Sequence, residues 1–150
     1  MSEFIRSIEK ILLRDLNKLA QELQQYPNEE SVWMLRGDIK NTAGNLCLHL
    51  CGNLQHYIGT NLGSTGYQRN RDAEFSTKNV SRTLLLTEID AARQAIVHTL
   101  PLLKDDQLDQ IYPEKVFAEP MTTRYFLIHL AAHLGYHLGQ MNYHRRMIQS

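Results

Sequence analysis

The chain is poor in residues that staple or interrupt a fold: its 150 residues include two cysteines, four prolines, eight glycines and one tryptophan. Cys47 and Cys51 lie four residues apart, a spacing ill suited to a structural disulfide within one helix. This excludes a small disulfide-stapled scaffold. A single domain of this length needs no staple, because it buries roughly 70% of its unfolded surface.

Net charge and long apolar runs are also missing. Sixteen Lys and Arg residues balance sixteen Asp and Glu residues, so the chain lacks the broad basic field that drives nucleic-acid binding. No apolar run approaches the roughly 20 residues of a membrane span, and residues 1–10 lack the apolar core of a secretory signal. We therefore expect a cytoplasmic protein that binds neither nucleic acid nor membrane.

Apolar residues recur at steps of three and four along four segments, the period of amphipathic helices. Pro27 ends the first segment, Ser81 is a suitable cap for the third, and Thr122 or Thr123 is suitable for the fourth. The predicted helices cover residues 3–26, 38–61, 81–103 and 122 to nearly the end.

Residues 62–79 are dense in Gly, Ser, Thr and Asn and follow neither the helical nor the strand period. We expect a long ordered loop there, crossing from the second helix to the third. No useful strand alternation and no internal repeat occur elsewhere. The sequence therefore predicts one all-α domain over residues 1–150, a four-helix bundle with a long crossover loop.

The densest group of reactive side chains is HLAAHLGYHLGQ, residues 129–140. On a helix, residues four apart have Cβ atoms about 6 Å apart, which allows two imidazoles to bind one metal ion. His129 with His133 and His133 with His137 both have this spacing. Because each four-residue step rotates by about 40°, only one pair faces the core well. The apolar stripe of the last helix favours His133 with His137.

Catalytic zinc sites take three protein ligands and leave a position for water or substrate. The second predicted helix offers His49 and His56, seven residues apart and on one face. Either supplies a third ligand, whereas Cys47 and Cys51 point away from His49 and are expected to be core residues. The alternative is that these histidines are hydrogen-bonded core residues.

Several catalytic motifs are missing. The sequence contains no H-E-x-x-H, no P-loop and no G-x-G-x-x-G. No Asp or Glu stands beside the histidines in the sequence, so Asp72, Glu74 or Glu88 would have to fold back to act as a base. His98 and His144 are expected to be solvated or to lie behind the ligands.

The segments NLCLHLCGNLQHYI (45–58) and HLAAHLGYHLGQMNYHRRM (129–147) resemble the DinB-like family of metal-binding four-helix proteins, also described as YfiT-like or bacillithiol-transferase-like. That family holds a divalent metal with one His of the second helix and an H-x-x-x-H pair of the last, often continued as H-x-G-Q. The match assigns His49, His133 and His137 as ligands, with His129 or His56 as the substitutes. Gln140 falls on the family's Gln, expected behind the ligands.

Further along, RNRDAEF (69–75) is similar to a segment of one subgroup. The resemblance implies that Arg69, Arg71 and Asp72 form ion pairs that brace the crossover loop.

The resemblance implies a metal-dependent enzyme, a thiol S-transferase that uses a low-molecular-weight thiol. Zinc is the first expectation for the metal, with nickel or another divalent ion second, because imidazole suits several metals. Asn53, Tyr57 and Tyr136 are candidate substrate-binding residues. The alternatives are a metal-dependent hydrolase and a non-catalytic protein with a structural metal. The resemblance also implies a homodimer, paired through exposed apolar residues of the first helix.

Overall fold

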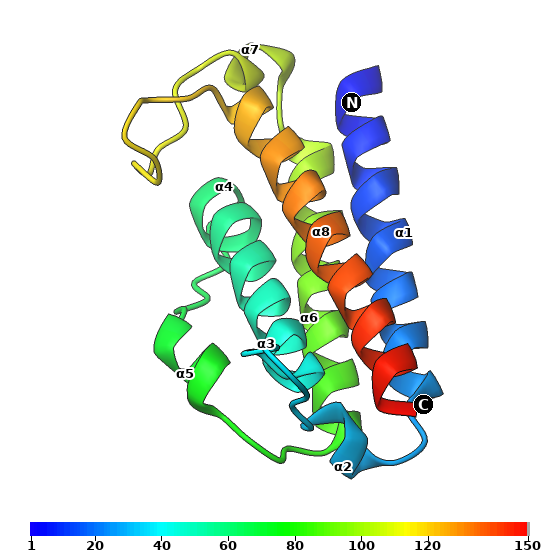
Figure 1. Cartoon of the computed structure of the whole chain (residues 1–150). Helices are drawn as coiled ribbons and strands as arrows, with labels where there is room; N and C mark the ends of the chain where they lie inside the picture. The colour runs from blue at the N-terminus through cyan, green and yellow to red at the C-terminus, as the bar shows by residue number, and fades with distance from the viewer. Residues whose placement is uncertain (150) are drawn as a thin grey trace.

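The computed structural model describes residues 1–149, and most of them are helical. Four long helical segments run side by side (Figure 1). No β-strand forms within residues 1–149, and a single isolated bridge joins Ile111 to Thr122. The long segments are α1 (Glu3–Gln25), α3 (Ala43–Leu54) with its continuations η1 (Gln55–Thr60) and α4 (Asn61–Gly63), α6 (Arg82–Thr99) and α8 (Thr123–Gln149).

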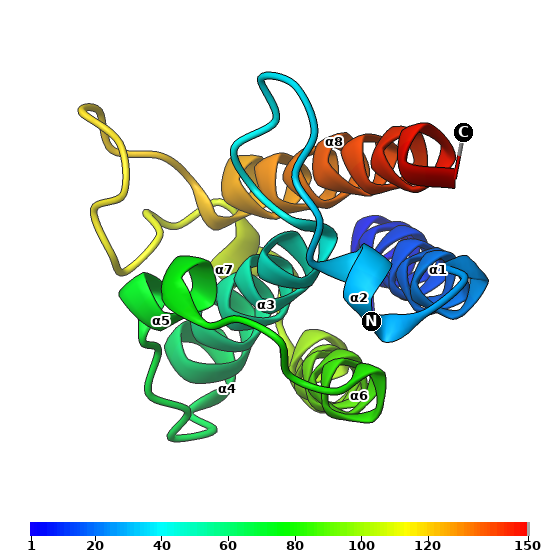
Figure 2. The ribbon, with the colours of Figure 1, turned by 60° about the horizontal axis from the view of Figure 1, so that its bottom comes forward.

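Each long segment packs against two others: α1 and α3 both contact α6 and α8. Figure 2 shows α1, α3, α6 and α8 surrounding a common interior. That interior is filled by aliphatic side chains that are nearly inaccessible to solvent, which is the main stabilising term for a domain without disulfides. They include Leu12, Leu16 and Leu19 of α1, Leu50 and Leu54 of α3, Ile89 and Ile96 of α6, and Leu130 and Leu134 of α8.

The first, third and fourth predicted helices are confirmed, together with two of their caps. The Ser81 hydroxyl accepts from the Leu84 N–H, and the Thr122 hydroxyl accepts from the Tyr125 N–H, both at 3.1 Å. These oxygens satisfy N–H groups that have no partner inside the helix. The third helix is shorter than expected, because α6 ends at Thr99 and a 3₁₀ turn, η2 (Leu100–Leu102), follows it.

Two predicted boundaries are wrong. The second helix begins at Ala43 and not at residue 38, because Thr42 caps it by accepting from the Asn45 N–H at 3.0 Å. The expected loop over residues 62–79 contains a helical turn, α5 (Arg71–Ser76), capped by the Asn70 side chain. The two remaining short helices are α2 (Glu29–Val32) and α7 (Asp105–Leu108).

The second long segment changes its winding at η1, a π-helical turn between α3 and α4. A π-turn inserts one extra residue and re-aims the side chains beyond it. Beyond α3, Tyr57 packs edge-to-face on Phe126 of α8, with ring centroids 4.9 Å apart. The turn therefore rotates the upper part of this segment relative to the part that carries His49.

The segment between α2 and α3 is anchored by Trp33. Its indole N–H donates to the Val80 carbonyl at 3.2 Å, and its ring lies on Gly44, where an added Cβ would stand 2.5 Å from ring atoms. A glycine is required at that contact, because no real Cβ approaches so closely. Every helix within residues 1–149 is too short or too polar to span a lipid bilayer.

His144 has a structural role, contrary to the expectation of a solvated or ligand-supporting residue. Its Nε2–H donates to the Met34 carbonyl at 2.8 Å, so in the neutral ring Nδ1 accepts from the Tyr26 hydroxyl at 2.6 Å. Burial raises the pKa of Tyr26, which keeps its hydroxyl protonated as the donor. This buried chain ties the end of α1 to α8.

We predict that Tyr26→Phe lowers the free energy of unfolding by about 1–2 kcal/mol, because it leaves His144 Nδ1 buried without a donor. Urea denaturation followed by circular dichroism measures the change. Tyr125→Phe is the control, since Tyr125 is exposed on α8 and its hydroxyl should contribute little. Equal midpoints for the two variants would contradict this role.

Candidate metal centre

The three histidines assigned from the sequence come together between α3 and α8. Each of His49, His133 and His137 offers one ring nitrogen, and these nitrogens all lie within 4.8 Å of one another. His49 Nε2 and His133 Nε2 are 3.2 Å apart. Two nitrogens bound to one tetrahedral zinc at about 2.1 Å would stand roughly 3.4 Å apart. The site therefore has the ligand type and spacing that a divalent metal requires.

His49 is oriented by a carboxylate from the segment between α4 and α6. Its Nδ1 lies 3.1 Å from Glu74 Oε1, and because a carboxylate only accepts, Nδ1 carries the proton and Nε2 presents its lone pair to the other histidines. Such a carboxylate behind a metal-ligating histidine sets the tautomer and makes the ligand more basic. From the sequence, Glu74 is only one of three acids that would have to fold back to act as a general base. In the structure it contacts His49 and orients that ring.

Arg69 holds Glu74 in place. The guanidinium donates through Nε to Glu74 Oε2 at 2.8 Å and through Nη2 to Oε1 at 2.9 Å. Burial alone would raise the pKa of Glu74, but hydrogen bonds from His49 and Arg69 outweigh it and the pKa is lowered. The expected bracing of the loop by Arg69 is thus present, although Glu74 is its acid partner. Arg71 lies over the Phe75 ring.

Gly52 provides the space that Glu74 occupies. It lies three residues after His49 on α3, and an added Cβ there would stand 1.9 Å from Glu74 Oε2. That distance is far below any real contact, and the Glu74 carboxyl carbon would be only 2.7 Å away. The close approach of the segment between α4 and α6 to α3 therefore requires a glycine.

The other two ligands have different surroundings. Gln140 Oε1 accepts from His137 Nδ1 at 2.7 Å, one turn along α8, which leaves Nε2 as the ligand atom. His133 Nδ1 is buried without a hydrogen-bond partner among residues 1–149. Burial, together with the neighbouring His137 and His49, lowers the pKa of His133 to about 3. His133 is therefore neutral near pH 7, as a metal ligand must be.

The two substitute ligands lie outside this group. His129 packs between the rings of Phe117 and Phe126, with centroids 4.9 and 5.7 Å from its own. His56 pairs with Glu114 at 2.8 Å. Both therefore have contacts outside the three-histidine group.

One family model matches the chain over its whole length. Residues 1–150 match the model of the family described as "Protein of unknown function (DUF1572)". The chain belongs to this family. A comparison with curated proteins gave no match.

In this family member the three candidate substrate-binding residues take different places around the histidines. Asn53 is buried one turn after His49, and its Oδ1 has no partner among the described residues. The Tyr57 ring lies 5.5 Å beneath the Arg69 guanidinium. The Tyr136 ring is 65% exposed and packs edge-to-face beside His137. Contact of these residues with a substrate stays a prediction.

Cys47 and Cys51 are free thiols buried in the core. The hydrogen bond that the Cys51 S–H donates to Cys47, together with burial, raises the pKa of Cys51, which keeps that thiol protonated and a poor metal ligand. The expectation that both cysteines are core residues is confirmed.

We predict that Gly52→Ala displaces Glu74 and weakens metal binding by about 10- to 100-fold, the usual effect of losing a residue that orients a ligand. Competition with a chromogenic chelator measures the affinity for Zn²⁺. Gly139→Ala is the matched control, because a Cβ there meets no atom within 4 Å and alanine favours a helix interior. An unchanged affinity in Gly52→Ala would contradict the orienting role of Glu74.

Proposed function

We propose that this protein binds one divalent metal ion through His49, His133 and His137, with zinc first and nickel or another divalent ion second. The proposal rests on one observation, the convergence of three ring nitrogens within 4.8 Å from two helices. It is supported by the acceptors behind two of them, Glu74 for His49 and Gln140 for His137. Histidines that only fill a core do not need acceptors that turn their free ring nitrogens toward one common point.

We further propose that the metal serves catalysis. Among residues 1–149 the group able to hold a metal has three members, and three protein ligands are the pattern of catalytic zinc, whereas structural zinc is enclosed by four. His133 and His137 are only half-buried, so a small molecule can reach them. A structural metal remains the competing function, and a fourth protein ligand on the bound ion would favour it.

The reaction we propose is transfer of an organic group to a low-molecular-weight thiol. A divalent metal at this site would favour the thiolate form of a bound thiol at neutral pH. The thiolate sulfur then forms a bond to an electrophilic carbon, the leaving group departs with the bonding electron pair, and the thiol proton passes to solvent. His49 keeps its orientation throughout, because Glu74 accepts its Nδ1–H.

Hydrolysis is the alternative reaction and it needs a general base. Glu74 is the carboxylate in contact with His49, but both of its oxygens accept from Arg69, and one also accepts from His49. A carboxylate so engaged, with a lowered pKa, is a weak base. This supports transfer over hydrolysis.

The arrangement of four long helices with a connection through α5 supports assignment to a four-helix bundle with a crossover, and with it the resemblance to DinB-like proteins. A cytoplasmic location is proposed from the sequence alone. We also propose a homodimer. The first helix, however, leaves no large apolar side chain exposed between Glu3 and Gln25, so we propose another surface for the pairing.

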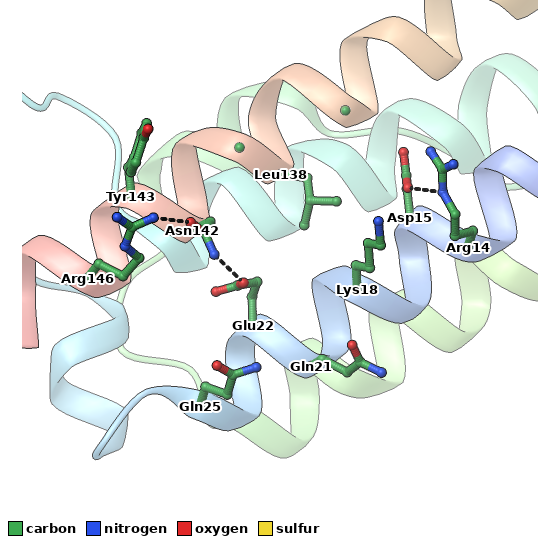
Figure 3. A pocket seen from close by; sticks show the side chains of 12 residues that line it. Arg14, Asp15, Lys18, Gln21, Glu22, Gln25, Leu138, Asn142, Tyr143 and Arg146 are labelled. Carbon is green, nitrogen blue, oxygen red and sulfur yellow. Dashed lines mark hydrogen bonds and ion pairs between the residues drawn. The ribbon is translucent and has the colours of Figure 1, made fainter.

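Exposed apolar side chains gather instead on the outer face of α8. Four of these side chains are 49–65% exposed and are separated by three, eight and seven residues, which places them on one face of the helix: Tyr125, Ile128, Tyr136 and Tyr143. Tyr143 projects from α8 away from α1 (Figure 3). The polar pocket of about 540 Å³ drawn there, between α1 and α8, has none of the three histidines in its lining. The α8 face is the surface we assign to the dimer.

We predict about one divalent ion per chain in protein purified without a His-tag, and a loss of most of that metal in His49→Ala and in His133→Ala. Elemental analysis measures the stoichiometry, and His98→Ala, an exposed residue of α6, is the control that retains it. Equal metal content in all variants would defeat the ligand assignment. With the metal established, thiol transfer and ester hydrolysis are assayed side by side.

We predict that Ile128→Arg converts the dimer to a monomer, because it places a charge in an apolar interface. Light scattering after size-exclusion chromatography measures the mass. Ile111→Arg introduces the same charge at a site 62% exposed outside α8 and should leave the dimer intact. A monomeric parent protein would contradict the dimer itself.

A further inference from the structure

A pocket of about 580 Å³ lies between the segment 36–41 and the C-terminal half of α8. Gln140 is part of its lining and is also the acceptor for His137 Nδ1 at 2.7 Å. One side chain therefore belongs both to the pocket wall and to the surroundings of the metal centre.

The direction of the helices places this pocket next to the centre. In Figure 1, α3 and α8 run in opposite directions. Leu46, in the pocket lining, precedes His49 by three residues on α3, and Gln140 follows His137 by three on α8. Three residues are slightly less than one helical turn. Both helices thus place the pocket about one turn from the histidines, on the same side.

The lining combines apolar walls with charge at the rim. Ile39, Leu46 and Tyr143 supply apolar surface, and Lys40 and Asp38 lie on the exposed segment beside them. The Arg36 guanidinium, also in the lining, donates to the Met147 carbonyl. The exposed Lys40 ammonium supplies a cation at this rim that can pair with an anionic group. An apolar pocket with a few charged groups suits a small molecule with an apolar body and an anionic group.

Residues 36–41 form one wall of the pocket, and contacts of the residues on either side of this segment fix its position. Trp33 packs on Gly44 and bonds Val80 on one side, and Thr42 caps α3 on the other. A wall fixed in this way can bind a ligand without first being ordered, which reduces the entropic cost of binding.

We infer that this pocket holds the non-reacting part of the substrate at the metal centre, and that this part is an apolar group bearing one carboxylate or sulfonate near Lys40. The inference rests on the proposed function, because it treats the three histidines as the reacting end. Binding of a remote substrate part in such a pocket would position the reacting atom near His137.

The probe for the pocket is 8-anilinonaphthalene-1-sulfonate, which has an apolar body and one anionic group and fluoresces when bound. Ile39→Trp, which fills the pocket, should abolish most of the binding, and Lys40→Glu should raise the dissociation constant about fivefold, the scale of a charge reversal near solvent. Lys10→Glu, the same change on exposed α1, is the matched control and should bind like the parent. Equal thermal melts show that no variant exposes its core to the dye. Equal dissociation constants in all four proteins would overturn the inference.

A second measurement tests the link to the metal centre. The protein is loaded with Co²⁺ or with Zn²⁺, the content of each is measured, and the bound dye is compared. Co²⁺ should quench its fluorescence strongly and d¹⁰ Zn²⁺ should not. Unquenched dye in protein that holds Co²⁺ would separate the pocket from the centre and overturn the inference. Protein that takes up neither ion would defeat the proposed function, while the dye titration still decides whether the pocket binds an anion.

Discussion

The candidate site depends on one buried ion pair, Arg69 with Glu74. Both residues come from the segment between α4 and α6, and Glu74 connects that segment to His49 on α3. Burying two charges costs several kcal/mol of hydration, and the cost is offset only where the geometry is good and further hydrogen bonds form. Here the guanidinium makes two bonds to the carboxylate and His49 supplies a third. The position of the segment between α4 and α6 and the orientation of His49 therefore depend on each other.

This ion pair also explains features of α3 that packing alone does not. Helix interiors disfavour glycine by about 1 kcal/mol relative to alanine, yet Gly52 stands inside the continuous helical segment formed by α3, η1 and α4, with the Glu74 carboxylate against it. Gly44, near the start of the same helix, receives the Trp33 ring in the same way. The two glycines let two loops approach one helix, and these loops form the surroundings of the histidines and of the neighbouring pocket.

Helix α8 has different functions on its different faces. Leu130 and Leu134 pack into the core, His133 and His137 meet α3, and the tyrosines face outward. Helix α8 carries few charged side chains because most of its surface contacts the core, α3 or the proposed partner subunit. The same helix continues beyond Gln140 along the pocket, so one element aligns the ligands, the pocket wall and the outer apolar face.

Much of this could be predicted from periodicity and spacing. The apolar steps located α1, α6 and α8, Ser81 and Thr122 marked the helix starts, and the four-residue spacing brought His133 and His137 to one face. Periodicity misplaced helix starts where a side-chain cap sets them. Thr42 caps α3, which therefore begins five residues after the predicted start at residue 38, and Asn70 caps α5 within the predicted loop. The outward position of Tyr136 also depends on what α8 packs against.

The sequence by itself determined the helical class and the placement of His133 and His137 on one helix face, because both follow from periods repeated along single helices. Only the tertiary structure decided that Glu74 orients His49, since the two lie 25 residues apart and no local pattern relates them. It also decided that Arg69 pairs with Glu74, that Gly52 makes room for both, and that a pocket adjoins Gln140. These are contacts between segments distant in the chain, and their geometry is set by packing.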